Sequence, residues 1–140
     1  MWEFNAATDV LLDRLGKAED SHPEKSHKIL EDLRNSGVDI VYRVDTLAYS
    51  PNTGGPGRMI LDPCHSIGAL QHEYRHFCDH RMAGYPGLGM YLADVLVFAR
   101  LEVRGYLEEV KVARETSNQD LVPIILGLMK ARVAQLLGSN

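Results

Sequence analysis

Two histidines four residues apart, with a glutamate directly after the first, are the strongest chemical signal in this chain. His72, Glu73 and His76 form the pattern H-E-x-x-H. On a helix, side chains four residues apart lie one above the other, so the two imidazoles would face one point. Such a pair suits a zinc ion (Zn2+), and Glu73 is placed to take a proton from a metal-bound water. The alternative is a chance match on an ordinary amphipathic helix.

The pattern needs a helix, and residues 66–82 predict one. Apolar side chains recur there at helical spacing, and Gly84 follows as a stop signal. The apolar positions are Ile67, Leu70, Tyr74, Phe77 and Cys78.

A catalytic zinc needs a third protein ligand, because such sites use three protein ligands and leave one position to water. His80 would extend the pattern to three histidines. In a continuous helix, however, His72 and His80 are about 12 Å apart along the axis, at about 1.5 Å per residue. His80 could therefore share an ion with His72 only if the helix broke after His76.

Glu102 is the favoured third ligand. It is the only carboxylate in the mostly apolar stretch 97–103. Buried carboxylates are rare unless they are paired or bound to a metal. The alternatives are a salt bridge from Glu102 to Arg100, Arg104 or Arg75, and Asp94 as the ligand instead.

Two further side chains could support the reaction. Asp79 shares the ligand face with His72 and His76, so it is expected to hydrogen-bond a ligand imidazole; otherwise it is a solvated helix residue. Tyr106 follows Glu102 by four residues, and its hydroxyl could donate to the developing oxyanion of a hydrolysed amide. Simple packing is the alternative for Tyr106.

Three weaker candidates lie near these residues. Tyr85 belongs to a glycine-rich turn, and Cys64 and His65 come just before the metal-binding helix. A Cys64 thiolate could take the open metal position, but the sequence favours an ordinary buried cysteine.

The surrounding pattern predicts an α+β domain, mostly helical, with a small antiparallel sheet ahead of the H-E-x-x-H helix. The dense Gly/Pro cluster at 51–57 indicates a hairpin turn, with a mobile loop as the alternative. A long helix after the turn at 83–89 is apolar around much of its girth and is expected to be central. The predicted helices are 4–16 (capped by Asn5 or Thr8), 24–35, 66–82, 90–114 and 121–137, and the predicted strands are 38–44, 46–50 and 58–61.

Composition limits the possible classes of protein. The 140 residues predict one domain, and their net charge of -4 argues against a nucleic-acid binder. No apolar run is long enough to span a membrane. The first residues lack a basic region followed by an apolar core, so no secretory signal peptide is expected. We therefore expect a cytoplasmic protein, or one secreted or translocated by a route that needs no signal peptide. The two cysteines, Cys64 and Cys78, do not form a disulfide framework and suit a reducing compartment.

Residues 38–110 resemble the minimal core of the zincin metallopeptidases, specifically the gluzincin type with two histidines and a downstream glutamate. The resemblance rests on His72-Glu73-x-x-His76-x-x-Asp79, followed by Ala83-Gly84 and later by Glu102 with Tyr106. The chain looks like the peptidase domains of anthrax-lethal-factor-like enzymes and of bacterial polymorphic toxins and effectors. This resemblance implies His72, His76 and Glu102 as zinc ligands and Glu73 as the catalytic base.

The expected function is zinc-dependent hydrolysis of peptide bonds by a single domain covering residues 1–140. Its partners would be a protein or peptide substrate and, for a toxin or effector, an immunity or inhibitor protein. The strand at 58–61 is expected to offer an edge on which an extended substrate pairs. The alternatives are a regulatory or binding module with a non-catalytic zinc site, or a zinc hydrolase of another substrate.

Overall fold

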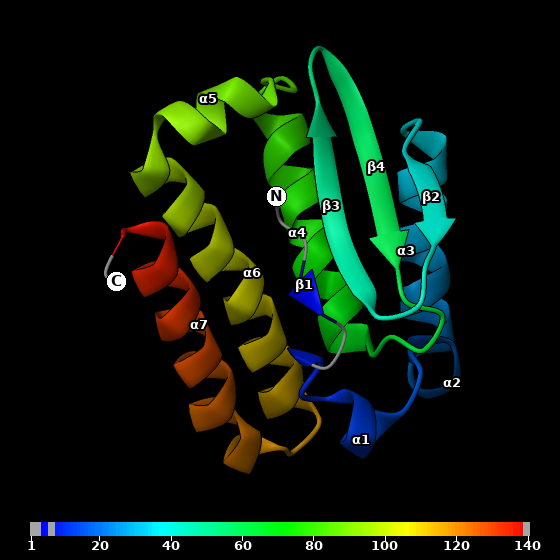
Figure 1. Cartoon of the computed structure of the whole chain (residues 1–140). Coiled ribbons are helices and arrows are strands. Elements are labelled where there is room, and N and C mark those ends of the chain that lie inside the picture. The colour runs from blue at the N-terminus through cyan, green and yellow to red at the C-terminus, as the bar shows by residue number, and fades with distance from the viewer. Residues whose placement is uncertain (1–3, 6–7, 139–140) are drawn as a thin grey trace.

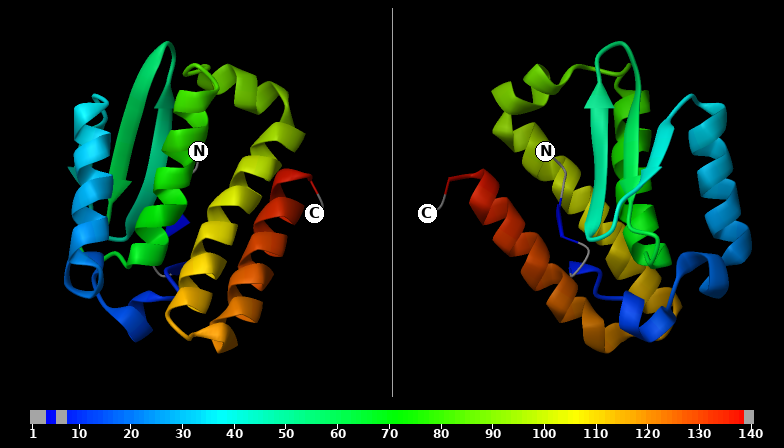
Figure 2. Two further views of the ribbon diagram at one scale, coloured as in Figure 1. Left: turned by 180° about the vertical axis from the view of Figure 1, so that it is seen from behind. Right: turned by 45° about the vertical axis from the view of Figure 1, so that its right-hand side comes forward.

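A computed structural model describes residues 4–5 and 8–138 of the chain. It has an α+β architecture in which a small sheet packs against one side of a helical body (Figure 1). Helix α4 (Ile67–Met82) lies between the sheet and α6 (Val95–Glu115), and α7 (Val122–Leu136) covers the far side of α6 (Figures 1 and 2). The predicted fold class is therefore confirmed.

The sheet is mixed rather than antiparallel. Its strand order is β1 (Phe4–Asn5), β3 (Thr46–Asn52), β4 (Gly55–Leu61) and β2 (Asp39–Tyr42). β3 pairs antiparallel with β1 and β4, but β2 pairs parallel with β4. The prediction of a purely antiparallel sheet was wrong, because alternation of apolar residues tells which face of a strand is buried and not which strand lies beside it.

The Gly/Pro cluster forms the predicted hairpin. β3 and β4 extend into the cluster from both sides, and the turn between them is Thr53–Gly54. Gly54 has a φ of 76°, a left-handed conformation that costs glycine little. β4 lies inside the sheet, between β3 and β2, so the expectation that residues 58–61 form an edge was wrong.

Helix α4 confirms the helix predicted at 66–82. The Ser66 hydroxyl accepts a hydrogen bond from the Ala69 amide at 3.1 Å, which caps the first turn. The helix continues without a break through His80. His72 and His76 therefore stand one turn apart on the same face.

The helix predicted at 90–114 is two helices. α5 (Leu88–Ala93) ends at Asp94, and α6 begins at the next residue. The Asp94 carboxylate accepts hydrogen bonds from the amides of Leu96 and Val97, at 3.2 and 3.3 Å. An aspartate that bonds to the backbone in this way caps a new helix, which explains the break and gives Asp94 a structural role.

The N-terminal prediction was wrong. The described part of 4–16 forms β1 and then the short α1 (Leu12–Leu15), while residues 6–7 of the predicted helix lie outside the described residues. Asp9 accepts hydrogen bonds from the Ser66 amide and hydroxyl at 2.8 and 2.6 Å, and Leu11 is fully buried. These tertiary contacts tie the segment to the start of α4 and outweigh its helical pattern.

The remaining helices follow the sequence closely. α2 (Ala18–Ser21) is an additional turn between the first two predicted helices, while α3 (Pro23–Asn35) confirms the helix predicted at 24–35. η2 (Gln119–Leu121) leads into α7, which confirms the last predicted helix. Within the part of the chain described here, no helix is long and apolar enough to cross a membrane.

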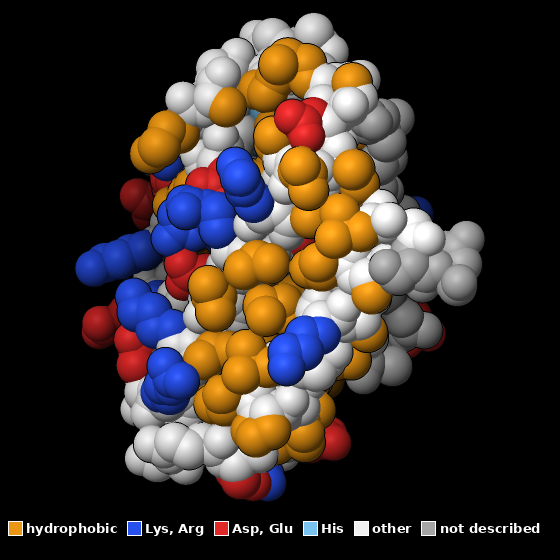
Figure 3. All heavy atoms as spheres, turned by 90° about the vertical axis from the view of Figure 1, so that its left-hand side faces the viewer, with side chains coloured by type: hydrophobic (Ala, Val, Ile, Leu, Met, Phe, Trp, Pro, Cys, Tyr) orange, Lys and Arg blue, Asp and Glu red, His pale blue; other side chains and the backbone are white. Residues whose placement is uncertain are grey.

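The α6–α7 side of the molecule exposes many apolar side chains (Figure 3). Leu96, Leu107, Ile124 and Leu137 are each about half exposed. α6 was expected to be central because it is apolar around much of its girth. Only its inner face is central, where Phe98, Glu102 and Tyr106 are buried.

Candidate metal centre

Three potential metal ligands converge between α4 and α6. His72 and His76 come from α4 and Glu102 from α6, and their ligand atoms all lie within 4.8 Å of one another. Ligands that share a zinc ion each lie about 2.0–2.2 Å from it, so they are at most about 4 Å apart. The observed cluster is close to that size, and all three side chains are fully buried.

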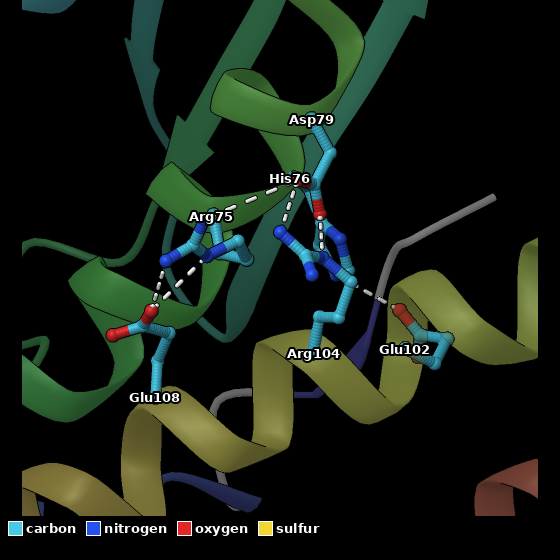
Figure 4. Close-up of polar contacts among 6 residues, drawn as sticks. All are labelled: Arg75, His76, Asp79, Glu102, Arg104 and Glu108. Atoms are coloured by element: carbon cyan, nitrogen blue, oxygen red, sulfur yellow. Dashed lines mark hydrogen bonds and ion pairs between the residues drawn. The ribbon is translucent and has the colours of Figure 1, made fainter. Parts of the chain in front are cut away.

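Glu102 presents one oxygen to this cluster. Its Oε1 is 2.9 Å from His76 Nε2, but among the described residues it accepts no hydrogen bond of ordinary geometry. Figure 4 shows the His76 and Glu102 side chains reaching toward each other from the two helices. Burial alone would raise the pKa of Glu102, but the contact with His76 and the charges of His72 and Arg132 lower it to about 2. A buried, ionised carboxylate oxygen without a hydrogen bond fits a metal ion as its partner.

His72 is oriented by a second glutamate that the sequence analysis did not identify. Its Nδ1 lies 2.6 Å from Glu109 Oε2, deep in the protein. Because Nδ1 is paired with Glu109, the other ring nitrogen, Nε2, is the one available to the site. Burial lowers the pKa of His72, but Glu109 and the charge of Glu73 outweigh it and raise the pKa to about 9. A carboxylate on the outer nitrogen is the usual support of a metal-binding histidine.

Glycine at position 105 lets α6 approach His72 closely. A Cβ atom there would lie 2.6 Å from both Cδ2 and Nε2 of the His72 ring. A side chain at this position would therefore collide with the nitrogen that faces the cluster. Glu102, Gly105 and Glu109 form one face of α6, which is built against the imidazole of His72.

Glu73 is also fully buried. Burial raises the pKa of its carboxyl to about 8, partly offset by the positive charge on His72. The backbone amide of Tyr49, on β3, lowers the pKa of Glu73 least among these influences. Glu73 is thus a carboxyl group that can carry a proton near neutral pH, one residue from a candidate ligand.

Asp79 does not take the predicted place beside a ligand histidine. It binds Arg104 of α6 through two hydrogen bonds, 2.8 and 2.9 Å long (Figure 4). Arg75 Nη1 lies 4.0 Å from Asp79 Oδ1, and Arg75 Nη2 lies 2.6 Å from Glu108 Oε1. These ion pairs fasten α4 to α6 at the rim of the site, and Glu109 fills the role expected of Asp79. Arg75 and Arg104, considered as partners of Glu102, bind other carboxylates, and Glu102 pairs instead with Arg132 of α7.

Tyr106 packs directly on a candidate ligand. Its ring meets the His72 ring edge to face, with the centroids 4.7 Å apart. This contact helps to fix the imidazole, while a role for the Tyr106 hydroxyl in catalysis stays a prediction.

His80 lies outside the cluster. Its Nδ1 is 2.6 Å from the Tyr49 hydroxyl, and its Nε2 is 2.9 Å from the Pro86 carbonyl oxygen. Tyr85 packs its ring on His80, at 5.1 Å between centroids. His80 and Tyr85 thus hold the turn after α4.

Cys64 and His65 take no part in the cluster of His72, His76 and Glu102. Cys64 is exposed, so the expectation of a buried thiol was wrong for this residue. His65 is buried, and its Nδ1 lies 2.7 Å from the carbonyl oxygen of Asp62. The segment 62–65 is a tight turn that leads into α4, which places the Cys64 side chain outside the core.

No protein-family model, curated protein or solved structure matches this chain. The assignment of the site therefore rests on the side chains described above.

Proposed function

We propose that the chain is a zinc-dependent hydrolase of peptide bonds. The observation that carries the proposal is the buried convergence of His72, His76 and Glu102 beside Glu73. Two imidazoles and one carboxylate are a ligand set used by catalytic zinc, which keeps a further position open.

Each residue then has a distinct part. His72, His76 and Glu102 would hold the zinc, with His72 oriented by Glu109. A zinc ion there would polarise the scissile carbonyl and bring the pKa of a bound water toward neutrality. Glu73 would take the proton of the attacking water and deliver it to the leaving amine. A pKa raised to about 8 by burial suits a group that must both accept and release a proton near neutral pH.

The substrate would be an extended peptide lying beside β3. β3 packs against α4, and the backbone amide of Tyr49 is near enough to Glu73 to lower its pKa. β3 therefore passes beside the proposed base. Extended peptides bind sheet edges through main-chain hydrogen bonds. β4, the strand expected to do this, is enclosed between β3 and β2, whereas among the described residues β1 pairs with β3 only at Thr46 and Leu47. Tyr106 would support the oxyanion.

One observation favours a second candidate. His72, Glu73, His76 and Glu102 are each 0% exposed, whereas water and substrate must reach the open position of a catalytic zinc. In that case the zinc would fasten α4 to α6 in a regulatory or binding module. The presence of Glu73 favours the hydrolase, because a structural site needs no base.

The two candidates are separated by comparing the parent with Glu73→Gln. Both proteins would be incubated with a native proteome, and newly formed N-termini would be counted by mass spectrometry. The hydrolase predicts new termini from the parent alone, with zinc bound equally by both forms. Identical sets of termini, with zinc retained, would favour the closed structural site.

The resemblance to toxin and effector peptidases suggests the setting. We propose action on proteins of a host or rival cytoplasm, with an immunity or inhibitor protein as the natural antagonist. Expression of the parent inside a susceptible cell should then slow growth, and expression of Glu73→Gln should not. Equal slowing by both forms would count against a hydrolytic toxin.

A further inference from the structure

We propose that Arg132, on α7, is a positioning residue that holds one oxygen of Glu102 away from the metal, so that Glu102 binds through its other oxygen alone. This inference rests on the metal site proposed above and not on the identity of the substrate.

The two oxygens of Glu102 have different surroundings. Oε1 lies 2.9 Å from His76 Nε2, in the cluster of candidate ligands. Oε2 accepts a hydrogen bond of 3.2 Å from Arg132 Nε. The carboxylate is fully buried, so each oxygen meets a defined partner rather than solvent. One oxygen is directed to the ligand cluster, and the other to a cation.

Arg132 is itself held in place. Its Nη1 donates a hydrogen bond of 2.8 Å to Gln135 Oε1, one turn further along α7. Its guanidinium carbon lies 5.9 Å from the centroid of the Phe98 ring, which belongs to α6. The Arg132 side chain is only 21% exposed. A guanidinium fixed on three sides has little freedom to leave Glu102, and its rigid donors suit a carboxylate better than a flexible ammonium does.

This arrangement affects how many positions of the metal the protein occupies. A carboxylate can bind an ion through one oxygen or through two. Two histidines and one carboxylate oxygen leave a zinc position open for water or substrate, whereas a second carboxylate oxygen would compete for that position. By holding Oε2, Arg132 favours the state with an open position. α7 would thus be part of the metal site, although it supplies no ligand.

The test is the substitution Arg132→Met, which keeps an unbranched side chain of similar reach and removes the cation. Lys130→Met is the matched control, because Lys130 is an exposed cation on the same helix and its loss changes the net charge equally. Two properties would be measured on the folded proteins. The first is zinc affinity, by competition with a chromophoric chelator. The second is the visible spectrum with cobalt(II) in place of zinc, which reports coordination number without any need for activity.

We expect Arg132→Met to weaken zinc binding by about 10–100-fold, the typical effect of losing a partner of a ligand. Its cobalt spectrum should shift toward higher coordination, while Lys130→Met should match the parent in both measurements. Arg132→Lys keeps the charge without the fork of donors, so its spectrum should lie between those of the parent and Arg132→Met. If Arg132→Met fails to fold, Arg132→Lys and Gln135→Ala provide the same comparison, with smaller shifts in the same direction.

A cobalt spectrum and zinc affinity of Arg132→Met equal to those of the parent would overturn this inference alone. A parent protein that binds neither cobalt nor zinc would overturn the metal site and this inference together. Absence of peptide cleavage, with metal binding intact, would count against the proposed peptidase and leave the role of Arg132 standing.

Discussion

Helix α4 carries histidines of two kinds, of which His72 and His80 are about two turns apart. His72 uses one ring nitrogen to bind the carboxylate of Glu109, and its other nitrogen faces His76 and Glu102. His80 contacts the Tyr49 hydroxyl through one nitrogen and the Pro86 carbonyl through the other. Burial lowers the pKa of His80, whereas neighbouring carboxylates raise that of His72. The partners of a buried histidine, rather than its burial, thus indicate whether it is available to a metal.

The largest expected effect is the loss of the metal from ligand variants. His76→Ala or Glu102→Ala removes one of three ligands, so zinc affinity should fall by several orders of magnitude. Zinc content after dialysis against a mild chelator would be measured by atomic absorption. Retention of stoichiometric zinc by Glu102→Ala would show that another residue is the third ligand.

His80→Ala is the contrasting variant and should retain zinc. It leaves the buried Tyr49 hydroxyl without its imidazole partner, so the free energy of unfolding should fall by about 1–3 kcal/mol. Urea denaturation of the metal-free proteins would measure this cost. Zinc loss from His80→Ala with unchanged stability would reverse the distinction between the two kinds of histidine.

A smaller effect is expected from the carboxylate behind His72. Glu109→Gln keeps the shape of the side chain but removes its charge, so zinc affinity should fall by about 10–100-fold. Asp79→Asn is the control, because Asp79 binds Arg104 at the rim of the site rather than either candidate ligand in α4. Competition with a chromophoric chelator would compare the two. A larger loss in Asp79→Asn than in Glu109→Gln would restore the role that the sequence suggested for Asp79.

The smallest change to test is a single methyl group at Gly105. Gly105→Ala places a Cβ 2.6 Å from His72 Nε2, so the ring or the helix must shift. The free energy of unfolding should fall by about 1–3 kcal/mol, as for an overpacked core, and zinc binding should weaken. Gly127→Ala on α7 is the control: apart from the backbone of its own helix, its Cβ meets no atom of the described residues within 4 Å, so it should stabilise the helix by about 0.5–1 kcal/mol. Thermal melting would compare the stability of each variant with that of the parent. A Gly105→Ala protein as stable as the parent would contradict the close packing of α6 on His72.

The sequence predicted the parts of the site that depend on local spacing. The four-residue interval between His72 and His76 places both imidazoles on one face of a single helix, which needs no knowledge of distant contacts. Glu102 was identified because it is the isolated acid in an apolar stretch. Glu109 could have been found, because it lies seven residues after Glu102 and so two turns along the same face of α6. Arg132 had no such signal, since its partner is 30 residues away on another helix. The parallel pairing of β2 and the tie of Asp9 to Ser66 were missed for the same reason: both depend on contacts between distant segments.

The most direct test of the central claim is zinc X-ray absorption spectroscopy on the purified parent protein. Ligation by His72, His76 and Glu102 predicts one zinc per chain, surrounded by nitrogen and oxygen at about 2.0–2.2 Å, with the multiple scattering of two imidazoles. Zinc–sulfur scattering at about 2.3 Å, which would involve Cys64 or Cys78, or a protein that takes up no zinc, would contradict the account.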